Sequence, residues 1–257
     1  MFVVLKKKLL IVAIVLLIVA VFGTLTLYEA DAAVVFLGRT NRKLPVYSVQ
    51  TEDKVVALSF DAAWGADKTQ AIMDILKSYD ATATFFLVGF WVDKYPEIVR
   101  EIDKNGFDIG THSTSHLHMS RLSAEEIKQD LVMSVDKITE ITGKTVKVFR
   151  PPFGEYNDTL IDVSHSLELM PVQWSVDSLD WKGISANEIV SRVISRVNKG
   201  SIVLCHNNSD HIVEALPLIL AALTAKGYKF STVSDLVLYE NYYIDHNGTQ
   251  HPENTAT

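Results

Sequence analysis

Residues 55–61 read Val-Val-Ala-Leu-Ser-Phe-Asp, a short apolar and β-branched run that ends directly on a carboxylate. Such a run is typical of a strand that is buried on both faces of a parallel sheet. A helical pattern follows at 68–79, and residues 83–88 (Ala-Thr-Phe-Phe-Leu-Val) then repeat the buried-strand pattern. The order strand, helix, strand predicts a βαβ unit of a parallel α/β fold.

The same alternation continues along the chain. Ser123 with Glu126, and Ser185 with Glu188, form capping boxes that predict two further helix starts. Gly143 predicts the end of the first of these helices. Further strand patterns occupy 107–110, 146–149, 171–174, 202–204 and 229–232. Seven such units predict a barrel or a doubly wound sheet.

The N-terminal segment belongs to a different physical class. Three lysines at 6–8 precede an uncharged stretch at 9–28, which as a helix is long enough to cross a hydrocarbon core of about 30 Å. The lysines predict a cytoplasmic N-terminus and an extracytoplasmic domain. Residues 30–32 (Ala-Asp-Ala) have the form of a signal-peptidase site, so a secreted protein cleaved near Ala32 remains an alternative. The length of the apolar run favours a retained single-pass membrane anchor.

These patterns divide the chain into four parts. Residues 1–32 are the predicted anchor, 33–50 a linker and lead-in, 51–239 the α/β domain and 240–257 a polar C-terminal tail. The formal net charge of −7 argues against nucleic acid as a partner. The single cysteine, Cys205, excludes a disulfide within the chain and a thiolate-rich zinc site.

Polar side chains follow the predicted strands at the points where the strands end. In chain order they are Asp61, His112 and His116, Arg150, Asp177, and His206. The carboxyl ends of the parallel strands of a barrel open on one face, where sites are built. The sequence therefore predicts that two acids, three histidines and an arginine share one mouth.

These segments resemble the motifs of the polysaccharide deacetylase family, which carries a NodB homology domain. The five motifs appear in order as Ser59-Phe-Asp61, His112-x-x-x-His116, Arg150-Pro-Pro-Phe-Gly154, Asp177-x-x-Asp-Trp181 and Leu204-x-His206. The segments around 44–49 and 59–65 look most like the PdaB-type sporulation branch of that family.

The resemblance implies a fold, a reaction and a partner. The implied fold is an irregular (β/α)7–8 barrel. The implied reaction is hydrolysis of the N-acetyl group of amino sugars in peptidoglycan or a related glycan, with one divalent metal, Zn²⁺ or Co²⁺. A role in sporulation and cell-wall modification follows from the branch.

The predicted chemistry assigns a role to each motif. Amide hydrolysis needs an activated water and a proton for the leaving amine. We expect Asp61 to be the general base, held and kept ionised by Arg150. His206 is the expected general acid, and Asp177 is expected to orient it.

The remaining motif residues concern metal and substrate. His112 and His116 are four residues apart, a spacing that suits two ligands of one zinc ion. Trp181 offers an apolar wall for an acetyl methyl group or a sugar face. The other predicted substrate-binding residues are Pro151, Phe153 and Leu204.

Position 62 departs from the family pattern. The first motif of the family carries a second aspartate as a metal ligand, and this chain has Ala62 there. A catalytic zinc normally has three protein ligands, so two histidines alone should bind metal loosely. Three outcomes are open: Asp61 moves onto the metal, Asp67 or a water held by residues 63–67 completes the shell, or the metal site is vestigial.

Two classes of function therefore remain. One is a membrane-anchored carbohydrate N-deacetylase, and the other is a non-catalytic glycan- or wall-binding protein of the spore envelope on the same barrel. An amidase for a small non-sugar C–N bond is a further alternative. The presence of Asp61, Arg150, Asp177 and His206 favours catalysis, because a binding protein has no need of a base and an acid.

Overall fold

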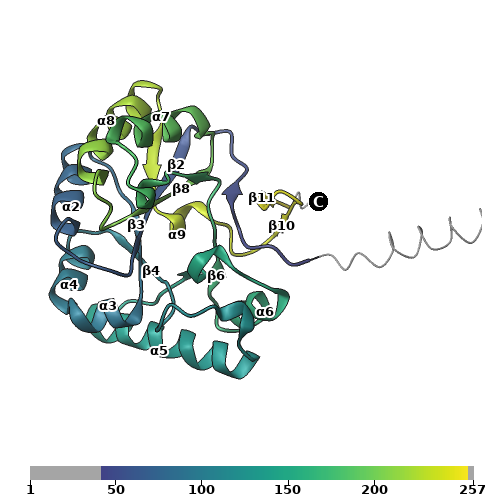
Figure 1. Cartoon of the computed structure of the whole chain (residues 1–257). Helices are drawn as coiled ribbons and strands as arrows, with labels where there is room; N and C mark the ends of the chain where they lie inside the picture. The colour runs from purple at the N-terminus through teal and green to yellow at the C-terminus, as the bar shows by residue number, and fades with distance from the viewer. Residues whose placement is uncertain (1–41, 254–257) are drawn as a thin grey trace, which may run out of the picture. The chain divides into compact units, whose positions relative to one another are not determined.

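A mostly parallel β-sheet runs through the residues that the computed structural model describes, 42–253 (Figure 1). The strands are β1 (Ser48–Val49), β2 (Val55–Ala62), β3 (Thr84–Leu87), β4 (Asp108–Thr111), β5 (Val148–Phe149), β6 (Met170–Pro171), β7 (Val176–Asp177), β8 (Ser201–His206), β9 (Lys229–Ser231), β10 (Tyr242–Ile244) and β11 (Thr249–Pro252). The predicted anchor at 1–32 lies outside the described residues. Within 42–253 no helix is long and apolar enough to cross a membrane.

Helices connect the strands and cover the outside of the sheet (Figure 1). They are α2 (Thr69–Ser78), α3 (Gly89–Lys94), α4 (Pro96–Lys104), α5 (Ala124–Thr142), α6 (Asp158–Ser166), α7 (Ala186–Arg196), α8 (Ile212–Ala225) and α9 (Val233–Leu236), with short 3₁₀ turns η1 (Met119–Arg121), η2 (Pro152–Gly154) and η3 (Asp180–Lys182). Both predicted capping boxes are present, at the starts of α5 and α7. Gly143 ends α5 with φ +68°, as its position predicts.

The parallel strands form a partial barrel. Along the sheet the order is β8, β2, β3, β4, β5, β6, and β7 pairs with β8 on the side away from β2, where the short β1 also pairs. The lead-in reaches the other end of this row, because Val46 forms a parallel bridge with Val172 next to β6. The predicted α/β class is confirmed. The barrel is irregular because β5, β6 and β7 contain two residues each, too few for a continuous ladder.

The two ends of the domain differ from the sequence expectation. Residues 240–257 were expected to be a polar tail, but β10 and β11 form a hairpin there, and β11 pairs with β1. Gln250 is fully buried, and its side chain bonds the backbone N–H and C=O of Leu238 at 2.7 and 2.6 Å. The turn contains Asn247-Gly248, with Gly248 at φ +82°. The lead-in and this hairpin are therefore part of the folded unit.

Alternation along β2 divides its side chains between two cores. Ala57 belongs to the smaller cluster with Phe86, Val148 and Ile202. Leu58, Phe60 and Ala62 belong to the larger cluster, which includes residues of the helices. Asp61 lies four residues after Ala57, so the two side chains are on the same face of β2. The carboxylate of Asp61 therefore points away from the helices. Ala62 is fully buried in the larger cluster.

Candidate active site

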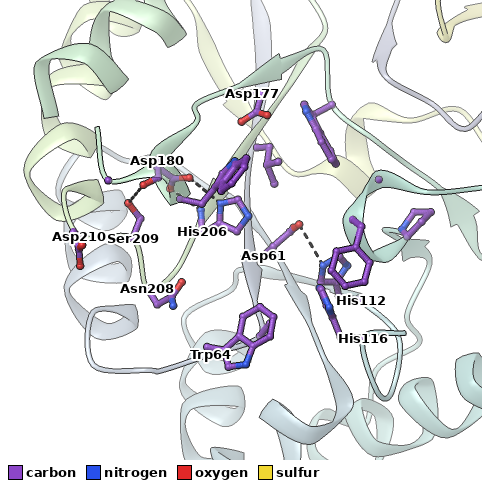
Figure 2. Close-up of a pocket in the computed structure, with 18 residues that line it drawn as sticks. Asp61, Trp64, His112, His116, Asp177, Asp180, His206, Asn208, Ser209 and Asp210 are labelled. Atoms are coloured by element: carbon purple, nitrogen blue, oxygen red, sulfur yellow. Dashed lines mark hydrogen bonds and ion pairs between the residues drawn. The ribbon is translucent and has the colours of Figure 1, made fainter. Parts of the chain in front are cut away.

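A cavity of about 580 Å³ opens at the carboxyl ends of the parallel strands (Figure 2). Nine of the ten residues predicted from the motifs line it: Asp61, His112, His116, Pro151, Phe153, Asp177, Trp181, Leu204 and His206. The tenth, Arg150, is fully buried behind Asp61. The fold thus brings the five sequence motifs to one place, as the parallel topology predicts.

Asp61 is held by a buried guanidinium. Nη1 of Arg150 donates to Oδ1 of Asp61 at 2.7 Å, and Nη2 donates to the backbone oxygen of Gln173 at 3.1 Å. The Arg150 guanidinium also lies 4.1 Å from the ring centre of Phe86. Burial by itself raises the pKa of Asp61, but the charge and hydrogen bond of Arg150, together with His112 and His206, bring the pKa below the usual value. Asp61 is therefore a carboxylate at neutral pH.

His206 is held by Asp180, whereas the sequence analysis assigned that role to Asp177. Oδ1 of Asp180 lies 2.8 Å from Nδ1 of His206, and Oδ2 accepts the backbone N–H of His206 at 2.8 Å. Figure 2 shows the Asp180 carboxylate directed at the His206 ring. Burial lowers the pKa of His206, but the hydrogen bond and charge of Asp180, together with the charges of Asp61 and Asp177, raise the pKa above the usual value.

Asp177 instead shapes the turn that carries Asp180. Its Oδ1 accepts the backbone N–H of Leu179 at 2.8 Å, and Leu179 has a left-handed φ of +56°. Its backbone oxygen accepts from Nε of Arg192 at 2.6 Å. The Asp177-x-x-Asp motif contained both acids, but spacing alone does not tell which one reaches the histidine.

The two histidines of the second motif lie side by side. Their ring centres are 4.9 Å apart and both rings line the cavity. Nδ1 of His112 lies 2.7 Å from the backbone oxygen of Arg150, so Nδ1 carries the proton. Burial lowers the pKa of His112, which leaves Nε2 with a free lone pair 3.5 Å from Oδ2 of Asp61. Burial also lowers the pKa of His116, to about 4.

These two neutral imidazoles fit two positions of a metal site, and a third ligand is missing. Ala62 is fully buried and does not line the cavity, and Asp67 is exposed outside it. Among residues 42–253, no group of three or more His, Cys, Asp or Glu side chains is arranged to hold a metal ion. The donor set therefore fits a loosely held ion and not the three-ligand centre of a typical catalytic zinc.

Exposed aromatic side chains form the rim of the cavity. Trp181 and Phe153, both predicted from the motifs, line it with more than half of their surface exposed. Trp64 is equally exposed and was not singled out in the sequence analysis. Its ring centre lies 5.2 Å from that of His116. Trp64 could have been predicted as a cavity residue from the sequence, because it lies three residues after Asp61 in the loop that follows β2.

Known proteins are similar to this chain over most of its described residues. The family model for polysaccharide deacetylase matches residues 48–172. A peptidoglycan-N-acetylglucosamine deacetylase of Bacillus cereus is 34% identical over 200 residues, covering 76% of this chain and 93% of that protein. YlxY, an uncharacterized protein of Bacillus subtilis, is 31% identical over 193 residues, covering 75% of this chain and 60% of YlxY. The chain thus spans less than two thirds of YlxY.

Similar solved structures include a pseudoenzyme and a mutant of it with restored activity. BA3943 of Bacillus anthracis, a pseudoenzyme of the CE4 family, matches with a TM-score of 0.73 and 30% identity over 80% of this chain and 72% of that one. A BA3943 mutant with restored enzymatic activity matches with a TM-score of 0.72 and 33% identity, covering 75% of this chain and 70% of that one.

Proposed function

Because this chain belongs to the polysaccharide deacetylase family, we propose that it hydrolyses the N-acetyl group of amino sugars in peptidoglycan or a related glycan. The proposal rests on two groups in one cavity whose pKa values are shifted in opposite directions. Asp61 has a lowered pKa and is a carboxylate, while His206 has a raised pKa, which favours its protonated form. A base and an acid kept in these states are what amide hydrolysis requires.

Each side chain has a defined task in this reaction. Asp61, fixed by Arg150, accepts a proton from the attacking water through its Oδ2, because Oδ1 is engaged by Nη1. His206 donates the proton on Nε2 to the departing amine, because Asp180 engages Nδ1. Trp181 and Leu204 supply apolar surface beside these groups for the acetyl methyl.

A loosely bound divalent ion, Zn²⁺ or Co²⁺, completes the proposal. His112 and His116 are the residues that would hold it, and when bound it supplies a Lewis acid for the acetyl carbonyl. The resemblance to the family implies one divalent metal. Activity should therefore depend on added metal and be lost on treatment with a chelator.

The test is acetate release from peptidoglycan, with and without added zinc or cobalt. Asp61→Asn and His206→Ala should each reduce release by about 10²–10⁴-fold, which is the usual value of general acid or base catalysis. Circular dichroism of both variants controls for folding. Rates like those of the wild type in either variant would remove that residue from the mechanism.

A second candidate is a non-catalytic glycan-binding protein. The replacement of the metal-ligand aspartate by Ala62 favours it, and the likeness to the pseudoenzyme BA3943 adds support. This candidate predicts glycan binding without acetate release at any metal concentration. Release that depends on Asp61 would contradict it.

We also propose an extracytoplasmic location and a role in sporulation. The lysines at 6–8 and the apolar stretch at 9–28 support a single-pass anchor with the domain outside, where peptidoglycan lies. The sporulation role rests on the resemblance to the PdaB-type branch. The test is a reporter that is active solely in the cytoplasm, fused after Thr257. It should be inactive, because the proposed topology places Thr257 outside the cytoplasm.

A further inference from the structure

The ring of Phe153 contacts two histidines that are two residues apart in the sequence. Its centre lies 4.5 Å from that of His116, with the two planes at 73°, and 4.3 Å from that of His118, with the planes at 15°. Phe153 and His116 line the cavity, whereas His118 does not. His118 therefore lies outside the candidate site and contacts it through the Phe153 ring.

His118 is held from a second direction by a carboxylate. Oε2 of Glu155 lies 2.9 Å from Nδ1 of His118 and also accepts from Oγ of Ser120 at 3.3 Å. The hydrogen bond from His118 lowers the pKa of Glu155, so Glu155 is a carboxylate at neutral pH and Nδ1 carries the proton. Phe153 and Glu155 are two residues apart, so one short segment both stacks on the His118 ring and binds its edge.

The orientation of Phe153 depends on its ring contacts. Its φ of +60° is in the left-handed region, which an aromatic residue rarely adopts. More than half of its side chain is exposed, so packing in the core does not hold the ring. Nε2 of Gln173 donates to the backbone oxygen of Gly154 at 3.1 Å, but this bond fixes the backbone and not the Phe153 rotamer. The stack on His118 therefore restricts the orientation of the ring.

Of the two candidate metal ligands, His116 depends more on neighbouring rings for its orientation. His112 is buried, and its Nδ1 lies 2.7 Å from a backbone oxygen. His116 is half-buried, and its ring centre lies 4.5 Å from that of Phe153, 4.9 Å from that of His112 and 5.2 Å from that of Trp64. Groups outside the coordination shell orient a metal ligand, and losing one typically weakens metal binding. This orientation matters more where two imidazoles hold an ion without a third protein ligand among residues 42–253.

We propose that His118 is a positioning residue of the candidate metal site. Held by Glu155, its ring keeps Phe153 against His116, and so keeps the His116 imidazole in the orientation that binds an ion together with His112. This inference rests on the proposed role of His112 and His116 as ligands. His118 is not a ligand itself, because Glu155 engages its Nδ1 and its ring lies outside the cavity.

The test is isothermal titration of the full chain with zinc at pH 7.5 in a mild detergent. His118→Ala should raise the Kd about three- to tenfold, the loss expected for one aromatic pair. His118→Phe keeps a ring for the stack but has no metal-binding atom, so it should recover most of the affinity. NMR of the metal-free proteins gives a second readout. The ring protons of His116 should shift in His118→Ala, because Phe153 moves, and much less in His118→Phe.

His251→Ala is the matched control. The ring of His251 stacks on Tyr243 with centres 4.8 Å apart, and its Nε2 lies 3.2 Å from Oδ2 of Asp245. It thus has the same two kinds of contact as His118, but neither His251 nor Tyr243 lines the cavity. The zinc affinity and the His116 signals of this variant should therefore be those of the wild type.

Metal binding and acetate release are measured separately, so the two proposals fail in different ways. An equal Kd for the wild type and His118→Ala, or no zinc binding by the wild type, would overturn the positioning role. A loss in His118→Phe as large as that in His118→Ala would also overturn it, because His118 would then act as a ligand. Weaker binding in His118→Ala that His118→Phe recovers, with no acetate release by any of the proteins, would support the positioning role and contradict the deacetylase function.

Discussion

The aspartates at positions 177 and 180 are three residues apart, yet they act on different partners. The carboxylate of Asp180 faces His206, and that of Asp177 accepts a backbone N–H. The distinction depends on Leu179, whose left-handed conformation turns the chain between them. Sequence spacing carries no information on that turn, so the prediction that Asp177 orients His206 was wrong, and Asp180 of the same motif takes that place.

Asp180→Asn should shift the pH dependence of the proposed deacetylation. The wild-type pKa of His206 is raised, so the imidazolium stabilises the fold below pH 6.5, and this contribution is lost as pH rises through the folded pKa. Removing the Asp180 charge lowers the pKa of His206. The alkaline limb of acetate release should therefore move to lower pH, together with the NMR titration of the His206 ring.

Asp177→Asn is the matched control for this prediction. It leaves the Asp180 carboxylate in contact with His206 and removes a more distant charge. Its pH profile should lie much closer to that of the wild type. A larger shift in Asp177→Asn than in Asp180→Asn would restore the assignment made from the sequence.

At the scale of elements, most of the sheet was predictable because each buried strand has its own apolar run. The long strands β2, β3 and β8 coincide with such runs. The two-residue β7 was missed because it is too short to show periodicity. The β10–β11 hairpin was missed because its composition is polar, although Asn247-Gly248 is a common hairpin turn.

Close packing of β3 on β4 supplies the element-scale prediction. A Cβ on Gly110 of β4 would lie 2.5 Å from the ring of Phe86 in β3. That ring in turn contacts the Arg150 guanidinium. Gly110→Ala should therefore overpack the barrel interior, lowering the free energy of unfolding by about 1–3 kcal/mol, and should also reduce activity by displacing Arg150.

Urea denaturation of Gly110→Ala measures the loss of stability. The double variant Gly110→Ala, Phe86→Leu replaces the ring with a smaller side chain and should recover part of that loss. If the stability losses of Gly110→Ala and Phe86→Leu simply add in the double variant, the coupling energy between them is near zero. That result would show that Phe86 is not the source of the strain.

On the scale of the whole molecule, Arg150 connects strands that are far apart in sequence. It follows β5, binds Asp61 of β2 and the backbone after β6, and packs on Phe86 of β3. The motif predicted the pair with Asp61, because both residues follow strands of one parallel sheet. The sequence could not predict that the guanidinium is fully buried, since that depends on how the partial barrel closes around it.

Arg150→Met should destabilise the fold in a pH-dependent way. Removing one partner of a buried ion pair typically costs about 3–5 kcal/mol, because the other charge is left uncompensated. In the wild type the lowered pKa of Asp61 contributes stability that is present above pH 3.8 and is lost as pH falls through the folded pKa. In the variant, burial without Arg150 raises the pKa of Asp61, so protonation stabilises the variant as pH falls.

The difference in unfolding free energy between the wild type and Arg150→Met should therefore be largest at pH 7 and smaller at pH 4.5, as measured by urea denaturation. Asp61→Asn combined with Arg150→Met removes the titrating group and is the control. Because this double variant buries no charge at the pair, its deficit should change less with pH than that of the single variant. A deficit in Arg150→Met that does not depend on pH would mean that Asp61 is not the charge that Arg150 compensates.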